Sequence, residues 1–132
     1  MLNQRANIEW VNGQPFSRRY GDIYFSREGG LAEKRHVFLD GNNLPERFTF
    51  LAPGQAFTVG ETGFGVGLNF LCARQLFEET APSGSSLDYF STEKYPLNEQ
   101  ELEQALAPWP EFRQYANELI QRWCRRVPGW NR

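Results

Sequence analysis

Three alternating glycines form the part of the sequence whose residue types and spacing could do chemistry. Gly63, Gly65 and Gly67 come directly after residues 56–61, which have the composition of a buried strand, and before an apolar segment at 68–77 with helical spacing. Glycines in such a turn let the backbone bend sharply and approach a ligand closely. The first N–H groups of the following helix attract an anionic group. The pattern is typical of a nucleotide-type binding site.

Two glutamates narrow the choice of ligand. Glu93 ends the next predicted strand, where an acidic side chain can accept hydrogen bonds from both ribose hydroxyls of an adenosine. Glu61 stands at the tip of the first strand, where it would repel a pyrophosphate but attract the ammonium group of a methionine moiety. The turn lacks the lysine and Ser/Thr of a P-loop and the G-x-G-x-x-G spacing of a dinucleotide site. The residues therefore favour S-adenosylmethionine over a dinucleotide, although glycines alone can also form a purely structural turn.

The elements around this turn predict an α/β fold. A strand at 56–61, a helix at 68–77 and a strand at 87–93 have the order and length of a right-handed βαβ unit, which implies a parallel sheet. Asn12-Gly13 predicts a β-hairpin over residues 6–18, and residues 31–39 fit a short helix that Gly41 ends. Two further helices are expected to begin at Asn98 and Pro110.

Four sequence blocks carry a resemblance to a known family. In chain order they are GDIYFS (21–26), RHVFL (35–39), ETGFGVGLNF (61–70) and FSTEKYPL (90–97). Together they resemble the N-terminal methyltransferase domain of the bifunctional tRNA 5-methylaminomethyl-2-thiouridine biosynthesis proteins, and the similarity runs from about Asn7 to Gly129. The resemblance implies a Rossmann-like class I methyltransferase fold with an N-terminal β-hairpin extension.

The resemblance also implies an activity. A methyl group would pass from S-adenosylmethionine to the aminomethyl nitrogen of 5-aminomethyl-2-thiouridine, the wobble uridine of certain tRNAs, giving 5-methylaminomethyl-2-thiouridine. In the family a separate C-terminal, FAD-dependent oxidoreductase domain first removes a carboxymethyl group, and we expect residues 1–132 not to include this second domain. The sequence does not tell which tRNAs are substrates.

Site roles follow from the same resemblance. The methionine part of the cofactor would be surrounded by residues of the glycine block, namely Glu61, Gly63, Gly65, Gly67 and Asn69. The ribose and the adenine edge would be held by Glu93, Lys94 and Pro96, and the pocket would be lined by Tyr24 and Phe25.

The chain departs from the family where the catalytic motif is expected. The class has a seven-stranded sheet with an Asp-Ala-Phe or Asp-Pro-Phe type motif after its fourth strand, but the only aspartates are Asp22, Asp40 and Asp88, none in such a motif. The catalytic residues are therefore unknown. We expect an incomplete domain, with residues 1–55 as an N-terminal extension of hairpin and short helices and 56–132 as the first βαβ unit plus the following helices. Such a piece should be inactive alone and could self-associate through its unfinished sheet.

Composition excludes several other functions. The net charge of −2 provides no global basic field, so any RNA contact must be local and DNA is not an expected partner. No apolar run is long enough to span a membrane, and two cysteines without a secretion signal favour the cytoplasm. The single histidine, His36, has no second ligand near it, so no metal site is predicted. An NAD-dependent oxidoreductase fragment and a non-catalytic interaction module remain the alternatives.

Overall fold

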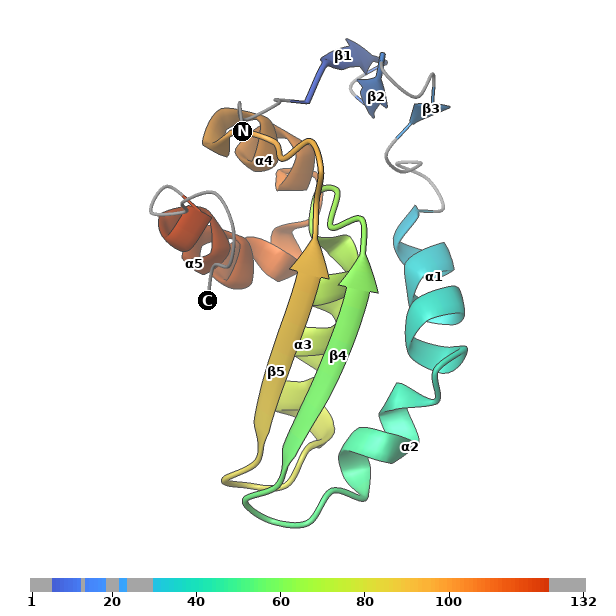
Figure 1. Cartoon of the computed structure of the whole chain (residues 1–132), viewed down its shortest axis with the longest axis vertical. Helices are drawn as coiled ribbons and strands as arrows, with labels where there is room; N and C mark the ends of the chain where they lie inside the picture. Colours follow the sequence, from blue (N-terminus) through green and yellow to red (C-terminus); the bar gives the residue numbers. More distant parts are fainter. Residues whose placement is uncertain (1–5, 13, 19–21, 24–29, 124–132) are drawn as a thin grey trace. The chain divides into compact units, whose positions relative to one another are not determined.

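The computed structural model describes residues 6–12, 14–18, 22–23 and 30–123 (Figure 1). Contacts within the chain divide it into two compact units. We call Glu28–Glu93 the central unit, and Met1–Arg27 together with Lys94–Arg132 the terminal unit. The domain boundary expected between residues 55 and 56 is a different division from these two units, and it stays a prediction.

The central unit is built on the predicted βαβ arrangement. Strand β4 (Ala56–Thr62) leads through the glycine turn into helix α3 (Leu68–Thr80), which returns to strand β5 (Ser86–Thr92). The two strands pair in parallel, with Ala56 opposite Ser86 and Thr62 opposite Thr92. In Figure 1 helix α3 runs behind both strands. The expected α/β class is therefore confirmed, and a sheet of two parallel strands carries the site.

The two faces of this sheet differ because side chains alternate along each strand. One face carries the less exposed residues of both strands, and the other face is exposed along its length. The covered face consists of Phe57, Val59, Glu61, Leu87, Tyr89 and Ser91. Glu61 and Ser91 thus occupy the same covered face of adjacent strands.

The segment before β4 is helical, but its helix is not uniform. Helix α1 (Gly30–Lys34) continues into a π-helix, η1 (Arg35–Asp40), so the expected short helix at 31–39 is confirmed while its change of winding was not foreseen. Gly41 ends it as predicted, and its N–H donates to the carbonyl of His36 at 3.0 Å. A Cβ at Gly41 would collide with the carbonyl oxygen of Val37. The wide last turn therefore requires glycine.

Helix α2 (Leu44–Thr49) was not predicted, and it anchors the core of the central unit. Its Phe48 side chain is fully buried. The Phe48 ring meets Phe57 of β4 at 5.0 Å and Phe77 of α3 at 5.2 Å between centroids, both edge to face. Edge-to-face pairs add to the stabilisation that burial of aromatic area already provides. One phenylalanine thus ties α2 to the strand and the helix that frame the glycine turn.

The terminal unit contains the predicted hairpin. Strands β1 (Ile8–Val11) and β2 (Gln14–Ser17) pair antiparallel, and Asn12 takes the positive φ of 52° that a tight hairpin turn requires. A short strand, β3 (Asp22–Ile23), pairs with β2. The N–H of Ala6 donates to the carbonyl of Pro96 at 3.5 Å, which links the hairpin to the later part of the same unit.

The terminal unit also contains the two predicted helices. Helix α4 (Glu99–Leu106) begins with a capping box, because Asn98 accepts from the Glu101 N–H at 2.8 Å and Glu101 accepts from the Asn98 N–H at 2.9 Å. A 3-10 turn, η2 (Pro110–Phe112), then leads into α5 (Arg113–Trp123). Within the described ranges, no helix is both long and apolar enough to cross a membrane.

Candidate functional site

The glycine turn has a backbone that other residues rarely adopt. Gly63, Gly65 and Gly67 have φ angles of 80°, 59° and 84°. This left-handed region carries a steric cost for residues with a Cβ, which explains the need for alternating glycines. The N–H groups of Gly63 and Phe64 both donate to the carbonyl of Thr92, at 2.8 and 3.0 Å. These bonds fasten the turn to the carboxyl end of β5.

Glu93 lies directly against this turn. Its Oε2 accepts a hydrogen bond from the Gly65 N–H at 2.8 Å, although the two residues are 28 positions apart in sequence. Glu93 follows immediately after β5, so the parallel ladder and the Thr92 carbonyl bring its carboxylate to the turn. The Glu93 carboxylate therefore lies at the middle glycine of the turn.

Glu61 is held by two side chains. Its Oε2 accepts from Asn69 Nδ2 at 2.8 Å, and its Oε1 accepts from the Ser91 hydroxyl at 2.9 Å. Asn69 lies in the first turn of α3, and Ser91 lies directly opposite Glu61 in the ladder. One donor on each oxygen fixes the orientation of the carboxylate while leaving it free to attract a cation.

One buried polar atom near Glu61 lacks a hydrogen-bond partner, and another lies beside the carboxylate. Among the described residues, the Oδ1 atom of Asn69 makes no hydrogen bond, whereas the buried hydroxyl of Tyr89 interacts with the Glu61 side chain. Burial raises the pKa of Tyr89 well above its ordinary value, and the negative charge of Glu61 raises it further. The phenol therefore stays neutral at physiological pH. Because buried polar groups are usually paired, this cluster has unused capacity for a ligand group or a water molecule.

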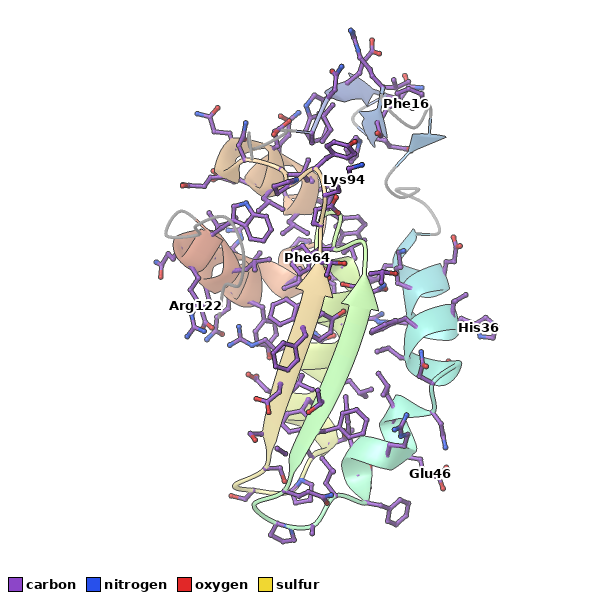
Figure 2. The ribbon with its side chains drawn as sticks, viewed as in Figure 1. Phe16, His36, Glu46, Phe64, Lys94 and Arg122 are labelled. Carbon is purple, nitrogen blue, oxygen red and sulfur yellow. The ribbon has the colours of Figure 1, made fainter. Side chains whose placement is uncertain are left out.

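The Tyr89 ring is part of an aromatic layer under the site. Its centroid lies 5.1 Å from that of Phe70, in an edge-to-face arrangement, and 6.5 Å from that of Phe38. Phe64, which is labelled in Figure 2, belongs to the turn itself, and its ring centroid lies 6.2 Å from that of Phe70. Through Tyr89, which interacts with Glu61, these rings place apolar area next to the carboxylate, and apolar surroundings strengthen electrostatic attraction.

The structure gathers most of the expected site residues in one place. Around the carboxyl ends of β4 and β5 lie Glu61, Gly63, Gly65, Gly67, Asn69 and Glu93. Lys94 and Pro96 belong to the terminal unit, where Lys94 Nζ lies 5.4 Å from the ring centroid of Tyr95. Tyr24 and Phe25 lie outside the described residues. The ligand-binding roles of all these residues stay predictions.

Ser91 and Tyr89 were not singled out from the sequence. The sequence did contain evidence for them, because side chains two residues apart in a strand point to the same face, and this rule places Tyr89 and Ser91 on one face of β5. Pairing either of them with Glu61 requires the register of β4 and β5, which no local pattern specifies.

Of four other residues with reactive or titratable side chains, three are exposed and Cys72 is buried. His36 is exposed and points away from the two strands (Figure 2). Cys72 is buried in α3 and lies near enough to Tyr89 to interact with it electrostatically. Asp40 and Asp88 are exposed. Within the part of the chain that the structure describes, no three His, Cys, Asp or Glu residues are grouped as metal ligands.

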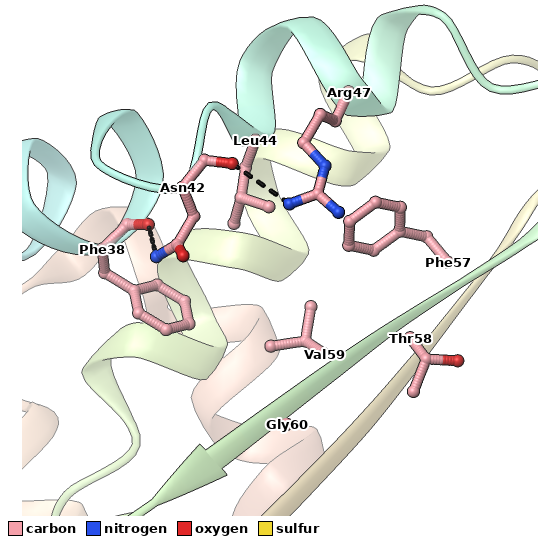
Figure 3. Close-up of a pocket in the computed structure, with 8 residues that line it drawn as sticks. All are labelled: Phe38, Asn42, Leu44, Arg47, Phe57, Thr58, Val59 and Gly60. Carbon is pink, nitrogen blue, oxygen red and sulfur yellow. Dashed lines mark hydrogen bonds between the residues drawn. The ribbon is translucent and has the colours of Figure 1, made fainter.

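A small pocket of about 170 Å³ lies between β4 and the segment of η1 and α2 (Figure 3). The Arg47 guanidinium sits 4.8 Å from the Phe57 ring centroid and donates to the carbonyl of Asn42 at 3.3 Å. Its charge is thus already engaged within the chain. The other lining residues carry no titratable group, so the pocket offers fewer recognition groups than the glycine turn does.

Sequence comparison identifies close relatives of this chain, although no family model matches it. Proteins named tRNA 5-methylaminomethyl-2-thiouridine biosynthesis bifunctional protein MnmC are similar over nearly the whole chain. The protein from Nitrosospira multiformis is 61% identical over 125 residues, which make up 95% of this chain and 20% of the relative. Those from Methylobacillus flagellatus and Pseudomonas aeruginosa are 54% and 52% identical over 97% and 98% of this chain, again 20% of each relative. The chain therefore spans about a fifth of their length.

A solved structure shares the fold. The crystal structure of MNMC2 from Aquifex aeolicus superposes with a TM-score of 0.64 and covers 98% of this chain and 39% of that one, at 20% sequence identity. At this identity the likeness concerns the fold alone, which is consistent with part of a Rossmann-like α/β fold. The sequence relatives confirm the resemblance itself: the chain is homologous to one segment of the bifunctional tRNA 5-methylaminomethyl-2-thiouridine biosynthesis proteins.

Proposed function

We propose that this chain is the S-adenosylmethionine-binding part of a tRNA-modifying methyltransferase. The proposed reaction transfers a methyl group to the aminomethyl nitrogen of 5-aminomethyl-2-thiouridine at the wobble position, in the cytoplasm. The relatives' name, which refers to biosynthesis of the methylated nucleoside, supports the substrate. The observation that carries the proposal is the pair of carboxylates, Glu61 and Glu93, beside one glycine turn.

The methionine end of the cofactor fits the polar cluster at Glu61. Asn69 Oδ1 is a buried acceptor without a donor, and it belongs to the side chain that already contacts the Glu61 carboxylate. An ammonium group is both a cation and an N–H donor, so it could satisfy the acceptor and neutralise the charge together. A pyrophosphate has negative charge and no donor, and would leave Asn69 Oδ1 unpaired.

The turn itself also disfavours a phosphate. A dinucleotide would need the turn's N–H groups, but Gly65 N–H is already bonded to Glu93, and Gly63 N–H and Phe64 N–H are bonded to Thr92. A phosphate at Gly65 would have to displace the carboxylate or accept its repulsion. A ribose offers hydroxyl donors instead, which Glu93 could accept without moving from the turn.

The residues of this chain would bind and orient the cofactor. S-adenosylmethionine, when bound, supplies an electrophilic methyl group. Glu61, held by Asn69 and Ser91, would fix the amino-acid end, and Glu93 would fix the ribose. Fixing both ends restricts rotation of the methyl donor, which is how an enzyme raises effective concentration. None of these residues is assigned as the acceptor of the amine proton, and Asp40 and Asp88 are both exposed.

Calorimetric titration of the chain tests the proposal. We expect S-adenosylmethionine and its demethylated product, S-adenosylhomocysteine, to bind and NAD not to bind. A Glu61→Gln variant should bind both adenosyl ligands more weakly, because it keeps the side-chain shape but loses the charge that attracts the ammonium. Preferential binding of NAD would support the oxidoreductase alternative. Absence of binding by any of the three ligands would support an interaction module.

A further inference from the structure

Ser91, in strand β5, forms a hydrogen bond with the carboxylate of Glu61 in strand β4. Its hydroxyl donates to Glu61 Oε1 at 2.9 Å, and Asn69 occupies Oε2 at 2.8 Å. The carboxylate is therefore held from two sides, by a strand residue and by a helix residue. It cannot rotate without breaking at least one of these bonds.

The position of Ser91 is set by the backbone and does not depend on a loop. Glu61 and Ser91 are directly opposite each other in the parallel ladder, and both side chains are on its covered face. Both residues are only partly exposed. A hydrogen bond to a carboxylate in such surroundings is stronger than one between neutral groups on the surface.

We propose that Ser91 is a positioning residue for the methionine part of the cofactor, acting through Glu61. This inference rests on the proposed function. With Ser91 present, the Glu61 charge is aimed at one point beside the unpaired Asn69 Oδ1. Without it, the carboxylate has freedom to turn, and the ligand's ammonium must order it again on binding.

A purely structural role makes a different prediction. If Ser91 only satisfies a partly buried carboxylate, its loss lowers the stability of the fold and affects every ligand alike. If it positions Glu61, its loss affects ligands that have an ammonium group and spares those that lack one. Two ligands of the same adenosine core therefore separate the two roles.

The experiment compares S-adenosylmethionine with 5′-methylthioadenosine, which keeps the adenosine and sulfur but has no amino-acid part. We expect Ser91→Ala to weaken S-adenosylmethionine binding about tenfold, the scale of a hydrogen bond to a charged group. Binding of 5′-methylthioadenosine should change less than about twofold. Ser91→Thr keeps a hydroxyl in a residue suited to strands and should restore most of the affinity.

Two controls make the comparison specific. Ser86→Ala makes the same chemical change at an exposed position of the same strand and should leave both affinities unchanged. Circular dichroism and denaturation report whether each variant is folded. If Ser91→Ala does not fold, Ser91→Cys, which has similar size but a weak donor, must show the same selective loss.

The possible results lead to different conclusions. Equal loss for both ligands, or unchanged S-adenosylmethionine affinity in folded Ser91→Ala or Ser91→Cys, would overturn the positioning role and leave the proposed function intact. Failure of the unmodified chain to bind S-adenosylmethionine would refute the proposed function, and the inference with it.

Discussion

Removal of the Glu93 side chain should affect cofactor affinity more than stability, because the cofactor would lose two hydrogen bonds to the carboxylate. The Glu93 Oε2 atom accepts a hydrogen bond from the Gly65 N–H, and loss of that bond should lower the free energy of unfolding by about 1.5–3 kcal/mol. Hydrogen bonds from the two ribose hydroxyls to a charged carboxylate are worth about 1.5–3 kcal/mol each. Loss of one such bond weakens binding by about ten- to a hundredfold, so Glu93→Ala, which removes both, should weaken S-adenosylmethionine binding by about a hundredfold or more.

Calorimetric titration and urea denaturation together measure the two effects. Glu93→Gln keeps an acceptor for the Gly65 N–H but loses the charge, so it should keep the stability and lose part of the affinity. Glu79→Ala removes an exposed glutamate on α3 and should change neither quantity appreciably. 5′-methylthioadenosine retains the ribose, so Glu93→Ala should weaken its binding as well, in contrast to Ser91→Ala.

Unchanged affinity in a folded Glu93→Ala protein would refute the ribose assignment. A fall in stability with no change in affinity would show that Glu93 serves only to cap the glycine turn. Loss of S-adenosylmethionine binding with full retention of 5′-methylthioadenosine binding would place Glu93 at the amino-acid end of the ligand.

Three further predictions concern the turn, the core and the chain as a whole. Gly65→Val should abolish cofactor binding, whereas Gly54→Val, at a φ of 81° with open space around it, should cost similar stability and leave calorimetric binding intact. Phe48→Ala should lower the free energy of unfolding by about 3–5 kcal/mol. Phe50→Ala, whose ring is 78% exposed, should change it by less than about 0.5 kcal/mol. The chain alone should show no methyl transfer to undermethylated tRNA and should self-associate in light scattering, and turnover by a monodisperse monomer would contradict both expectations.

Features that depend on neighbouring residues were predictable from the sequence. The hairpin turn at Asn12 and the capping box of Asn98 and Glu101 use contacts between residues at most three positions apart. The glycine turn was predictable for the same reason, because its positive φ angles depend on the glycines themselves. These local structures do not depend on how the rest of the chain folds, because the hydrogen bonds and backbone angles that produce them involve only neighbouring residues.

Features that depend on distant partners were not predictable in the same way. The π-helix η1 carries Phe38, whose ring meets Tyr89 in β5, and a local apolar pattern does not distinguish its winding from that of an α-helix. Helix α2 has only six residues, too few for a clear helical period, and its Phe48 is held by rings from β4 and α3. Tertiary packing decides both elements.

The candidate site was predictable in part for the same reason. Glu61 and Asn69 come from one sequence block, eight positions apart, so they were grouped from the start. Ser91 is thirty positions from Glu61, and their pairing depends on which residues of two parallel strands stand opposite each other. A shift of one residue would turn Ser91 to the other face.

The compact span of the site has a consequence for how the protein is made. The hydrogen bonds that Glu61 accepts from Asn69 and Ser91, and the one that Glu93 accepts from Gly65, join residues between positions 61 and 93, and the bonds from Gly63 and Phe64 to Thr92 fall in the same interval. During synthesis the amino-terminal part of a chain folds first, and contacts between nearby residues form faster than those between distant ones. Once residue 93 has left the ribosome, every side chain of this polar cluster is available to assemble. The cluster can therefore take shape on the nascent chain before the ribosome has translated the residues that follow it.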